Sequence, residues 1–263
     1  MTGRVALVTG AARGIGAATA AALVNSGWSV LATDSAADDP ALPYPMATPA
    51  DLSRLAEQAG GPGQLHTFVA DVRDPAAVWA AVAEAESRWG GLDAAIAAAG
   101  VIAGGVPLWQ VPADQQQAVL DVNLGGVLTL ARAAVPALLR RPAPRSGRFL
   151  AVASAAATRG LPMLAAYCAA KAGVAGLIRA LAAELAGHGV TANAVSPGST
   201  ATPILDESAR LYGLPAAGAF ARQQPMGRLL DPAEVAAVLA FLAGPGSSGM
   251  TGAIVPVDGG LAL

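Results

Sequence analysis

The stretch from Val5 to Gly16 limits the fold of this chain more than any other. An apolar run, Val5 to Val8, is typical of a buried strand, and it leads through T-G-A-A-R-G-I-G, Thr9 to Gly16, into an alanine-rich helical stretch. Glycines in such a turn let the backbone approach a pyrophosphate at the helix N-terminus, where free N–H groups and the helix dipole favour an anion. An ordinary glycine-rich βα turn is the alternative, but the strand–turn–helix context favours a dinucleotide site.

Further strand-like runs alternate with helical stretches along the chain, which indicates an α/β fold with a doubly wound parallel sheet. The chain of 263 residues, 54% of them hydrophobic and 13% charged, can bury a substantial core. No internal repeat or linker divides it, so we expect a single domain over residues 1–263. After the first strand, the predicted strands cover residues 28–33, 65–70, 93–99, 148–153, 190–195 and 253–257.

Asp34 ends the second predicted strand, about twenty residues beyond the glycine turn. An acid at this place accepts hydrogen bonds from the adenosine ribose hydroxyls of NAD. It also repels the extra phosphate of NADP, because like charges ~4 Å apart cost roughly 4 kcal/mol at an effective dielectric of ~20. Arg13 would offset little of this, since an exposed ion pair contributes only ~0–1 kcal/mol. A solvated strand-end acid is the alternative; the position favours NAD.

Residues 35–64 interrupt the alternation of predicted strands and helices. They hold one short helical stretch, 51–59, among several glycines and the prolines Pro40, Pro43, Pro45, Pro49 and Pro62. So long a loop in a compact domain is usually functional or disordered, and this insertion starts beside the predicted adenosine site. A plain surface excursion and a flap over the cofactor explain it equally well.

The ends of the later strands carry polar or small residues, and ligands bind at strand ends in an open parallel sheet. Asn123 lies within a helical stretch over 112–139 and must satisfy its amide if it is buried, so it is either a hydrogen-bonding hub or part of a site. After the sixth strand, residues 199–228 resemble a lid over the substrate, irregular from Thr202 on. The strand ends themselves are Asp71-Val72, Ala99-Gly100, Ser154 and Ser196 to Thr200.

Tyr167 and Lys171 are four residues apart in A-A-Y-C-A-A-K, Ala165 to Lys171. The segment predicts a helix over 165–187, and residues i and i+4 project from one helix face. A free tyrosine loses its proton near pH ~10, but a unit charge at ~5 Å and an effective dielectric of ~20 is worth roughly 3 kcal/mol, about two pKa units. Such a phenol would exchange protons at neutral pH. A tyrosine and a lysine on an exposed helix are the alternative.

Other classes of protein find little support. The net charge is −2 and the sequence has no basic run, so we expect no nucleic-acid-binding surface. The single cysteine, Cys168, fits a reducing cytoplasm, and we expect it to pack rather than react. We expect no signal peptide and no membrane span, because glycines and Pro107 break the uncharged run 94–109. His66 and His188 lie far apart, so no metal site is predicted.

Several of these signals follow one another in a fixed order along the whole chain. They are T-G-x-x-x-G-I-G at Thr9 to Gly16, Asp34, Asp71-Val72, Asn123, Ser154, Tyr167-x-x-x-Lys171, Pro197-Gly198 and D-G-G at Asp258 to Gly260. Together they resemble the short-chain dehydrogenase/reductase family. The resemblance implies a seven-stranded, Rossmann-like parallel sheet with helices on both faces, and a nicotinamide cofactor, which Asp34 makes NAD.

The resemblance also implies a role for each residue. Tyr167 transfers the proton, Ser154 hydrogen-bonds the substrate oxygen, Lys171 lowers the tyrosine pKa and holds the nicotinamide ribose, and Asn123 positions a water in the proton relay. Thr202 matches the position that contacts the carboxamide. The cofactor site would then consist of Gly10, Arg13, Gly14, Ile15, Gly16, Asp34, Asp71, Val72, Ala99, Gly100, Tyr167, Lys171, Pro197, Gly198, Thr200 and Thr202.

Two features set this chain apart within the resemblance. The family's usual N-N-A-G after the fourth strand reads Ala97-Ala98-Ala99-Gly100, so the amide hydrogen bonds of those asparagines are absent. The proline-rich insertion, with its D-D-P-A-L-P-Y-P segment, resembles an actinobacterial branch described as mycofactocin-coupled. Members of that branch are thought to hold NAD without exchange and to pass electrons to a peptide-derived carrier.

The substrate predicted from the sequence is an uncharged, fairly hydrophobic secondary alcohol or its ketone. Arg159 would meet a carboxylate only if it points inward, which would make a carboxylated dihydrodiol of the dihydroxybenzoate type the runner-up. The expected pocket walls are nearly all apolar: Val101, Ile102, Leu108, Trp109, Leu161, Met163, Leu205, Tyr212 and Phe220.

Two further classes stay open. A serine hydrolase would need a G-x-S-x-G elbow with a partner histidine, and neither histidine has that context. A non-catalytic dinucleotide-binding protein has the same fold, but the complete Ser, Tyr and Lys set argues against it. The family resemblance also implies a homotetramer or homodimer that pairs the helices at 112–139 and 165–187.

Overall fold

The computed structural model describes residues 3–61 and 63–263, so Pro62 and the first two residues lie outside the described part. Within it, seven parallel strands form one sheet in the order β3-β2-β1-β4-β5-β6-β7. The predicted doubly wound α/β fold is confirmed. The strands are β1 (Val5–Thr9), β2 (Ser29–Asp34), β3 (Gln64–Val69), β4 (Ala94–Ala97), β5 (Gly147–Val152), β6 (Val190–Pro197) and β7 (Ile254–Val257).

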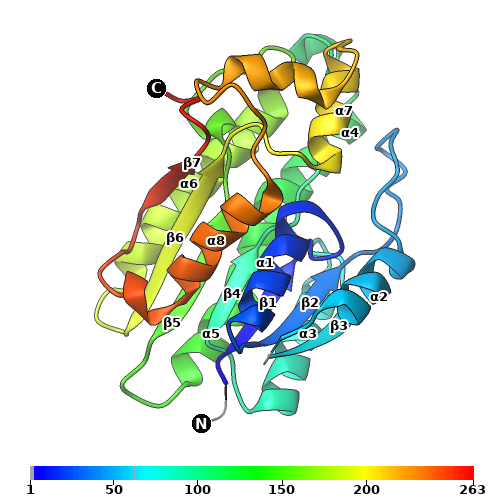
Figure 1. Cartoon of the computed structure of the whole chain (residues 1–263). Coiled ribbons are helices and arrows are strands. Elements are labelled where there is room, and N and C mark those ends of the chain that lie inside the picture. Colours follow the sequence, from blue (N-terminus) through cyan, green and yellow to red (C-terminus); the bar gives the residue numbers. More distant parts are fainter. Residues whose placement is uncertain (1–2, 62) are drawn as a thin grey trace.

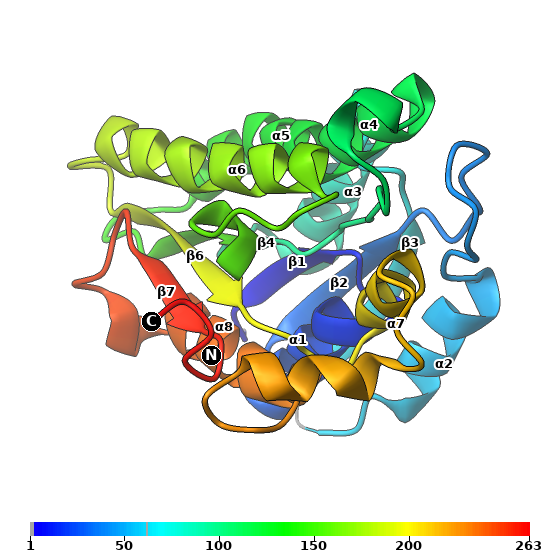
Figure 2. The same ribbon diagram turned by 90° about the horizontal axis from the view of Figure 1, so that it is seen from above.

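Helices cover both faces of this sheet (Figures 1 and 2). One face packs against α3 (Pro75–Trp89), α5 (Gly126–Arg140) and α6 (Ala165–Glu184), and the other against α1 (Gly14–Asn25) and α8 (Pro232–Ala243). Strands β1, β4 and β5 are therefore buried on both sides, which explains why their residues are mostly apolar, with the buried Arg148 of β5 as the charged exception.

Capping residues define where several helices begin. The Asp74 carboxylate accepts the Ala76 N–H at 2.8 Å, and Pro75 occupies the first helical position of α3. Asp231 and Glu234 form a capping box at the start of α8. An aspartate followed by a proline thus begins both helices. In the insertion, α2 (Pro49–Gln58) begins in the same way after Thr48.

The helix predicted over 112–139 is interrupted. It consists of α4 (Ala113–Leu120), a π-helical turn at Asp121–Gly125 and then α5. The amide of Asn123 donates to the Val119 carbonyl at 2.8 Å, which is the acceptor that a regular helix would offer to the backbone N–H of residue 123. A buried side chain has thus replaced part of the helix hydrogen bonding.

The prediction that residues 202–228 are irregular is wrong. Thr202 precedes α7 (Pro203–Leu211), which has proline at its first position, and a short 3₁₀ stretch follows at Ala217–Gln223. The signal was present, because a threonine followed by proline is typical of a helix start. Figure 2 shows α7 above the ends of the strands, on the α1 side of the sheet.

Two helical stretches, 113–140 and 165–184, are long and apolar enough to cross a membrane by length and composition. Both contribute to the core instead. Leu130 and Leu138 of α5 and Val174 and Ile178 of α6 are fully buried against the sheet. We therefore interpret them as core helices of an α/β domain.

Candidate active site

A cavity of about 670 Å³ extends along the carboxyl ends of the strands. It spans the point where the strand order reverses between β1 and β4, which is the usual ligand site of such sheets. All the cofactor and catalytic residues predicted from the sequence line it. Each of the first six strands contributes at least one of them: Gly10, Asp34, Asp71, Ala99, Ser154 and Gly198.

The glycine turn after β1 fits a bound pyrophosphate. Gly10 and Gly14 have φ of 64° and 58°, in the left-handed region that favours glycine. A Cβ on Gly16 would lie 2.1 Å from the Gly10 carbonyl oxygen, so a side chain has no space there. Arg13, the N-cap of α1, provides no side-chain cap, which leaves the first N–H groups of the helix for an anion in the cavity.

Asp34 lines the cavity beside the glycine turn, at the end where the sequence predicts the adenosine. One carboxylate oxygen accepts the Ala12 N–H at 3.1 Å and the other accepts the Ala36 N–H at 3.2 Å. Ala36 has φ of 50°, which is uncommon for a residue other than glycine. The carboxylate therefore holds the glycine turn and the beginning of the insertion together.

The first part of the insertion, residues 35–47, forms a strap along this end of the cavity; α2 and the link to β3 follow it (Figure 1). Arg13 donates to the Pro45 carbonyl at 3.1 Å, so its guanidinium is directed at the strap. Five strap residues line the cavity, which favours the flap over the plain excursion: Ser35, Ala37, Asp39, Met46 and Ala47.

A chain of charges holds the strap to the end of β3. Arg73 donates to both oxygens of Asp71 and, at 2.6 Å, to Asp39, whose side chain is buried. Burial raises the pKa of Asp71 and the hydrogen bonds from Arg73 lower it, with a net shift downward. Asp71 thus lines the cavity and also positions Arg73, which holds the strap through Asp39. The sequence did not indicate this second contact.

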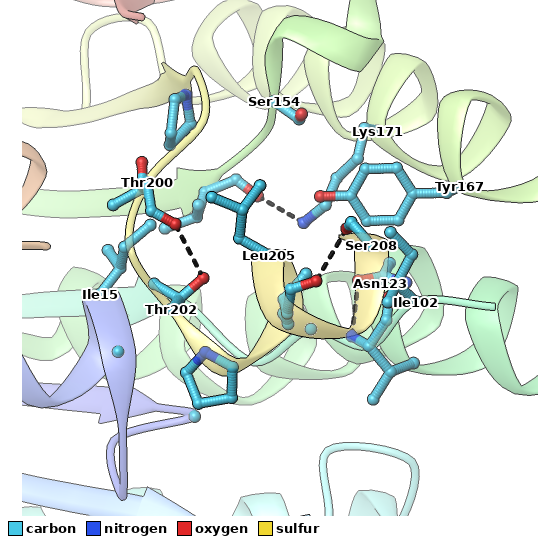
Figure 3. A pocket seen from close by; sticks show the side chains of 18 of the residues that line it. Ile15, Ile102, Asn123, Ser154, Tyr167, Lys171, Thr200, Thr202, Leu205 and Ser208 are labelled. Atoms are coloured by element: carbon cyan, nitrogen blue, oxygen red, sulfur yellow. Dashed lines mark hydrogen bonds between the residues drawn. The ribbon is translucent and has the colours of Figure 1, made fainter. Parts of the chain in front are cut away.

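Ser154, Tyr167 and Lys171 converge on the other half of the cavity (Figure 3). Ser154 follows β5, and its hydroxyl accepts the Ala156 N–H at 3.1 Å. Lys171 is 4% exposed and donates to the Val152 carbonyl at 2.8 Å. Its Nζ lies 5.7 Å from the centre of the Tyr167 ring. The predicted pairing of a phenol with an ammonium on one face of α6 is confirmed.

Without the cofactor, burial of the phenol outweighs the predicted effect of Lys171 on its pKa. Burial raises the pKa of Tyr167, and the hydrogen bond with Ser154 offsets only part of that rise. Burial also lowers the pKa of Lys171 to about 8, so the ammonium itself is destabilised here. The phenol is therefore neutral at physiological pH unless another positive charge enters the site.

Asn123 is a hydrogen-bonding hub that also lines the cavity. Its side-chain oxygen accepts the Val101 N–H at 3.2 Å, and its amide donates to the carbonyls of Val101 and Val119, each at 2.8 Å. Both amide hydrogens are used in this way, while the oxygen keeps one lone pair. Of the two interpretations left open by the sequence, the hydrogen-bonding hub is confirmed, and a role in a site stays a prediction.

The substrate half of the cavity is mostly apolar. Val101, Ile102, Leu161, Leu205, Tyr212 and Phe220 line it as predicted. Three predicted walls lie outside the lining: Trp109 and Leu108 are 83% and 47% exposed, and Met163 lies behind the lining. Their sequence positions are close to the site, but the 3₁₀ turn Leu108–Gln110 turns outward. Residues that we missed come mainly from α7 and the C-terminal segment: Leu164, Ile204, Ser208, Leu214 and Leu261.

Two polar residues support this half of the cavity. Arg159 is exposed at the rim of the cavity, and its guanidinium donates to the Leu261 carbonyl. The side chain therefore neither points into the cavity nor extends freely into solvent. Gln224, 2% exposed, holds the turn after β6, because its side chain accepts the Ser199 N–H at 2.7 Å and donates to the Ser199 carbonyl. Sequence offered no signal for Gln224. Cys168 is half-buried behind the lining.

The loop after β6 connects the two halves of the site. Thr200 donates to the Gly198 carbonyl at 3.1 Å, and Thr202 donates to the Thr200 carbonyl at 3.2 Å. The Thr202 methyl would lie 3.3 Å from a Cβ on Gly14, so this loop faces the glycine turn across the cavity (Figure 3). Cofactor and substrate would therefore share one continuous space.

Comparison with known proteins agrees with this geometry. Residues 10–262 match a family model described as enoyl-(acyl carrier protein) reductase. The chain is 36% identical over 260 residues to 2-dehydro-3-deoxy-L-rhamnonate dehydrogenase (NAD(+)) of Sphingomonas sp. strain SKA58, covering 98% of this chain and 95% of the relative. It is 38% identical to cis-4-hydroxycyclohexanecarboxylate dehydrogenase of Sinomonas cyclohexanicum, covering 98% and 96%.

Among solved structures, carveol dehydrogenase from Mycobacterium avium in complex with NAD matches with a TM-score of 0.92. Its sequence is 32% identical, and the match covers 99% of this chain and 98% of that one. The likeness therefore extends over the whole sheet, the helices on both faces and the loops that form the cavity.

Proposed function

The chain belongs to the short-chain dehydrogenase/reductase family and is an NAD-dependent oxidoreductase acting on CH–OH groups, and we propose that its substrate is a fairly hydrophobic secondary alcohol or the corresponding ketone. One observation carries this proposal: the space beside Ser154 and Tyr167 is enclosed by the apolar walls Val101, Ile102, Leu161, Leu205, Tyr212 and Phe220. Such walls favour a hydrocarbon body around the reacting carbon.

In this proposal each residue has one task. Bound NAD supplies the hydride acceptor for alcohol oxidation or, as NADH, the hydride donor for ketone reduction. Ser154 donates a hydrogen bond to the substrate oxygen, and the Tyr167 hydroxyl gives a proton to that oxygen or takes one from it. Lys171 has one hydrogen bond to the Val152 carbonyl, which leaves two N–H groups for the cofactor ribose.

Without the cofactor, the protonation state of the Tyr167 phenol decides whether the site favours ketone reduction or alcohol oxidation. Because burial raises the pKa of the phenol, it holds its proton at neutral pH and is ready to protonate a ketone oxygen. Alcohol oxidation requires the phenolate. We propose that the positive charge of oxidised NAD supplies the missing stabilisation, since an opposite charge nearby lowers a phenol pKa.

A panel of alcohols tests the substrate class. We expect carveol and cyclohexanol to be oxidised with bound or added NAD, and glycerol to be a poor substrate because it leaves the apolar walls unfilled. Reduction of the matching ketones with NADH should show the same order. Equal turnover of glycerol and cyclohexanol would contradict the proposal.

A carboxylated alcohol is the second candidate, favoured by the place of Arg159. Arg159 lies at the rim of the substrate half, where a substrate carboxylate would compete with the Leu261 carbonyl for the guanidinium. The dihydrodiol of the runner-up would enter in the same way. Testing cis-4-hydroxycyclohexanecarboxylate against cyclohexanol distinguishes the two candidates: Arg159→Gln should reduce turnover of the acid alone.

We also propose that NAD stays bound between turnovers and that mycofactocin accepts the electrons. The support is the strap, which lies along the adenosine end and is held by Asp39, Arg73 and Arg13. Denaturing the purified protein should release NAD, detected by its mass. A protein purified without NAD that turns over freely with added NAD would contradict this part of the proposal.

The remaining expectations are proposals of the same kind. We propose that copies of the chain pair through α5 and α6 as a homodimer or homotetramer, for which the 43% exposed Leu128 of α5 offers an apolar contact. Light scattering at several concentrations tests the pairing.

We also propose a cytoplasmic location, because the lone Cys168 fits a reducing compartment; fractionating cells tests it. A non-catalytic dinucleotide-binding protein would bind NAD and oxidise no alcohol of the panel.

A further inference from the structure

The segment 98–102, directly after β4, lines the cavity, and we call it the wall. Alanines occupy positions 97 and 98, where the family pattern has asparagines. The Thr9 hydroxyl holds this turn, because it accepts the N–H groups of Ala98 at 3.2 Å and Ala99 at 3.3 Å. Asn123 then holds Val101 through both its N–H and its carbonyl.

The next residue, Ile102, is held from an unexpected direction. Its backbone N–H donates to the hydroxyl of Tyr44 at 2.9 Å, and Tyr44 belongs to the strap, 58 positions earlier in the chain. Ile102 is 2% exposed and Tyr44 is half-buried, so this N–H is largely shielded from solvent water. Its side chain lines the cavity near Asn123 (Figure 3).

Tyr44 is packed so that its hydroxyl stays in place. Its ring contacts a buried apolar cluster that includes Leu42 of the strap, Val72, Val101 and Val119, and the ring of Tyr167 lies against the same cluster. Burial raises the pKa of Tyr44 to about 12, so the hydroxyl is neutral over the physiological range. Tyr44 is not among the residues that line the cavity, and its hydroxyl contacts the wall through the Ile102 N–H.

We propose that Tyr44 is a positioning residue of the substrate site: its hydroxyl fixes the Val101-Ile102 wall, so that the strap shapes the substrate half of the cavity as well as the cofactor half. The inference rests on the proposed function, because the wall is defined by the substrate that it contacts. It adds a role for the insertion that cofactor binding alone does not require.

The hydrogen bond between the Ile102 N–H and the Tyr44 hydroxyl predicts what removal of the hydroxyl oxygen alone would do. Tyr44→Phe keeps the ring in the apolar cluster and removes only the acceptor, which leaves the buried Ile102 N–H without a partner. The wall must then shift or open to water. Because Ser154, Tyr167 and Lys171 stand on other elements, we expect substrate binding to suffer while the proton transfer continues.

Steady-state kinetics of Tyr44→Phe in the full-length holoenzyme test the proposal, with cyclohexanol and carveol as probes. We expect KM for both alcohols to rise about tenfold and kcat to change less than about twofold, the order expected for one unsatisfied buried N–H. Arg54→Ala is the matched control in the same insertion, since the Arg54 side chain is exposed and pairs with Asp51. An unchanged KM, or a fall in kcat alone, would overturn the proposal.

Hydrogen exchange at the Ile102 amide provides a measurement that does not depend on activity. Tyr44→Phe should speed exchange there about tenfold or more, while amides in β1 and α6 keep their protection. If the wild-type protein oxidises no alcohol, the proposed function fails, yet this exchange still reports on the contact. Unchanged exchange at Ile102 overturns the role of Tyr44 whatever the activity.

Discussion

The two sides of the cavity are held by different means. Ser154, Tyr167 and Lys171 stand on the end of β5 and on α6, which are fixed by the strand ladder and by the buried residues of the core. The strap, residues 35–47, has neither helix nor strand. It is held by side-chain hydrogen bonds that cross to other elements: Asp39 with Arg73, Arg13 with Pro45, and Tyr44 with Ile102.

This difference separates chemistry from access. A neutral hydrogen bond of the strap contributes about 1 kcal/mol net, and one between charged groups such as Asp39 and Arg73 about 1.5–3 kcal/mol. Opening the strap therefore costs far less than unfolding α6, whose apolar side is part of the core. The catalytic residues can stay rigid while the strap decides what enters and leaves. Variants of the catalytic residues should consequently change turnover, and variants of the strap should change the binding and release of NAD and substrate.

The largest effect is expected on the catalytic side, from Tyr167→Phe. Removal of the phenolic oxygen deletes the proton-transferring atom, so turnover should fall about 10³-fold or more. The strap contacts are untouched, so NAD should remain bound. Single-turnover kinetics and NAD released on denaturation measure the two quantities. A variant that retains most of its activity would sink the assignment of Tyr167.

Lys171→Met should lower kcat about 10²-fold with little loss of stability at pH 7. The ammonium is destabilised by burial, so its removal offsets the lost hydrogen bond to the Val152 carbonyl. Because the pKa falls from 10.5 to about 8 on folding, the unfolded state binds more protons between these values. Wild-type stability should then rise across that window by up to about 3 kcal/mol. Urea unfolding at both ends of the window should show a rise that Lys171→Met lacks.

Asp34→Asn should change the NADP-to-NAD preference by about 10²-fold, a smaller effect than that of Tyr167→Phe on turnover. The amide keeps one acceptor for the N–H groups of Ala12 and Ala36 while the charge disappears. Dissociation constants for the two cofactors, measured on protein freed of its cofactor, test this. An unchanged ratio would refute Asp34 as the residue that selects NAD.

Asp39→Asn should give the smallest effect, on the strap side. Loss of the charge weakens the contact with Arg73, so NAD should dissociate about three- to tenfold faster, with kcat unchanged. Glu57→Gln, at an exposed position on α2 in the same insertion, is the matched control. Faster release in both variants would mean that charge in general, and not the strap contact, governs retention.

The comparison also explains what was predictable from sequence. The glycine turn, the acid at the end of β2, Ser154 and the Tyr–Lys pair could be recognised in the sequence, because each depends on spacing within one strand, turn or helix. Leu108 and Trp109 were placed wrongly in the wall, since their side of a short 3₁₀ turn is set by packing elsewhere. The π turn at Asn123 was missed because a buried amide competes there for the Val119 carbonyl.

The sequence by itself determined the sheet, the cavity at its carboxyl edge and the chemistry placed there. Apolar periodicity, helix caps and glycines act over a few residues, so their consequences are local and can be read along the chain. Only the tertiary structure decided that burial raises the pKa of Tyr167 and that Tyr44 reaches Ile102. Both depend on atoms brought together from distant segments, and desolvation and long-range hydrogen bonds exist only once those segments have packed.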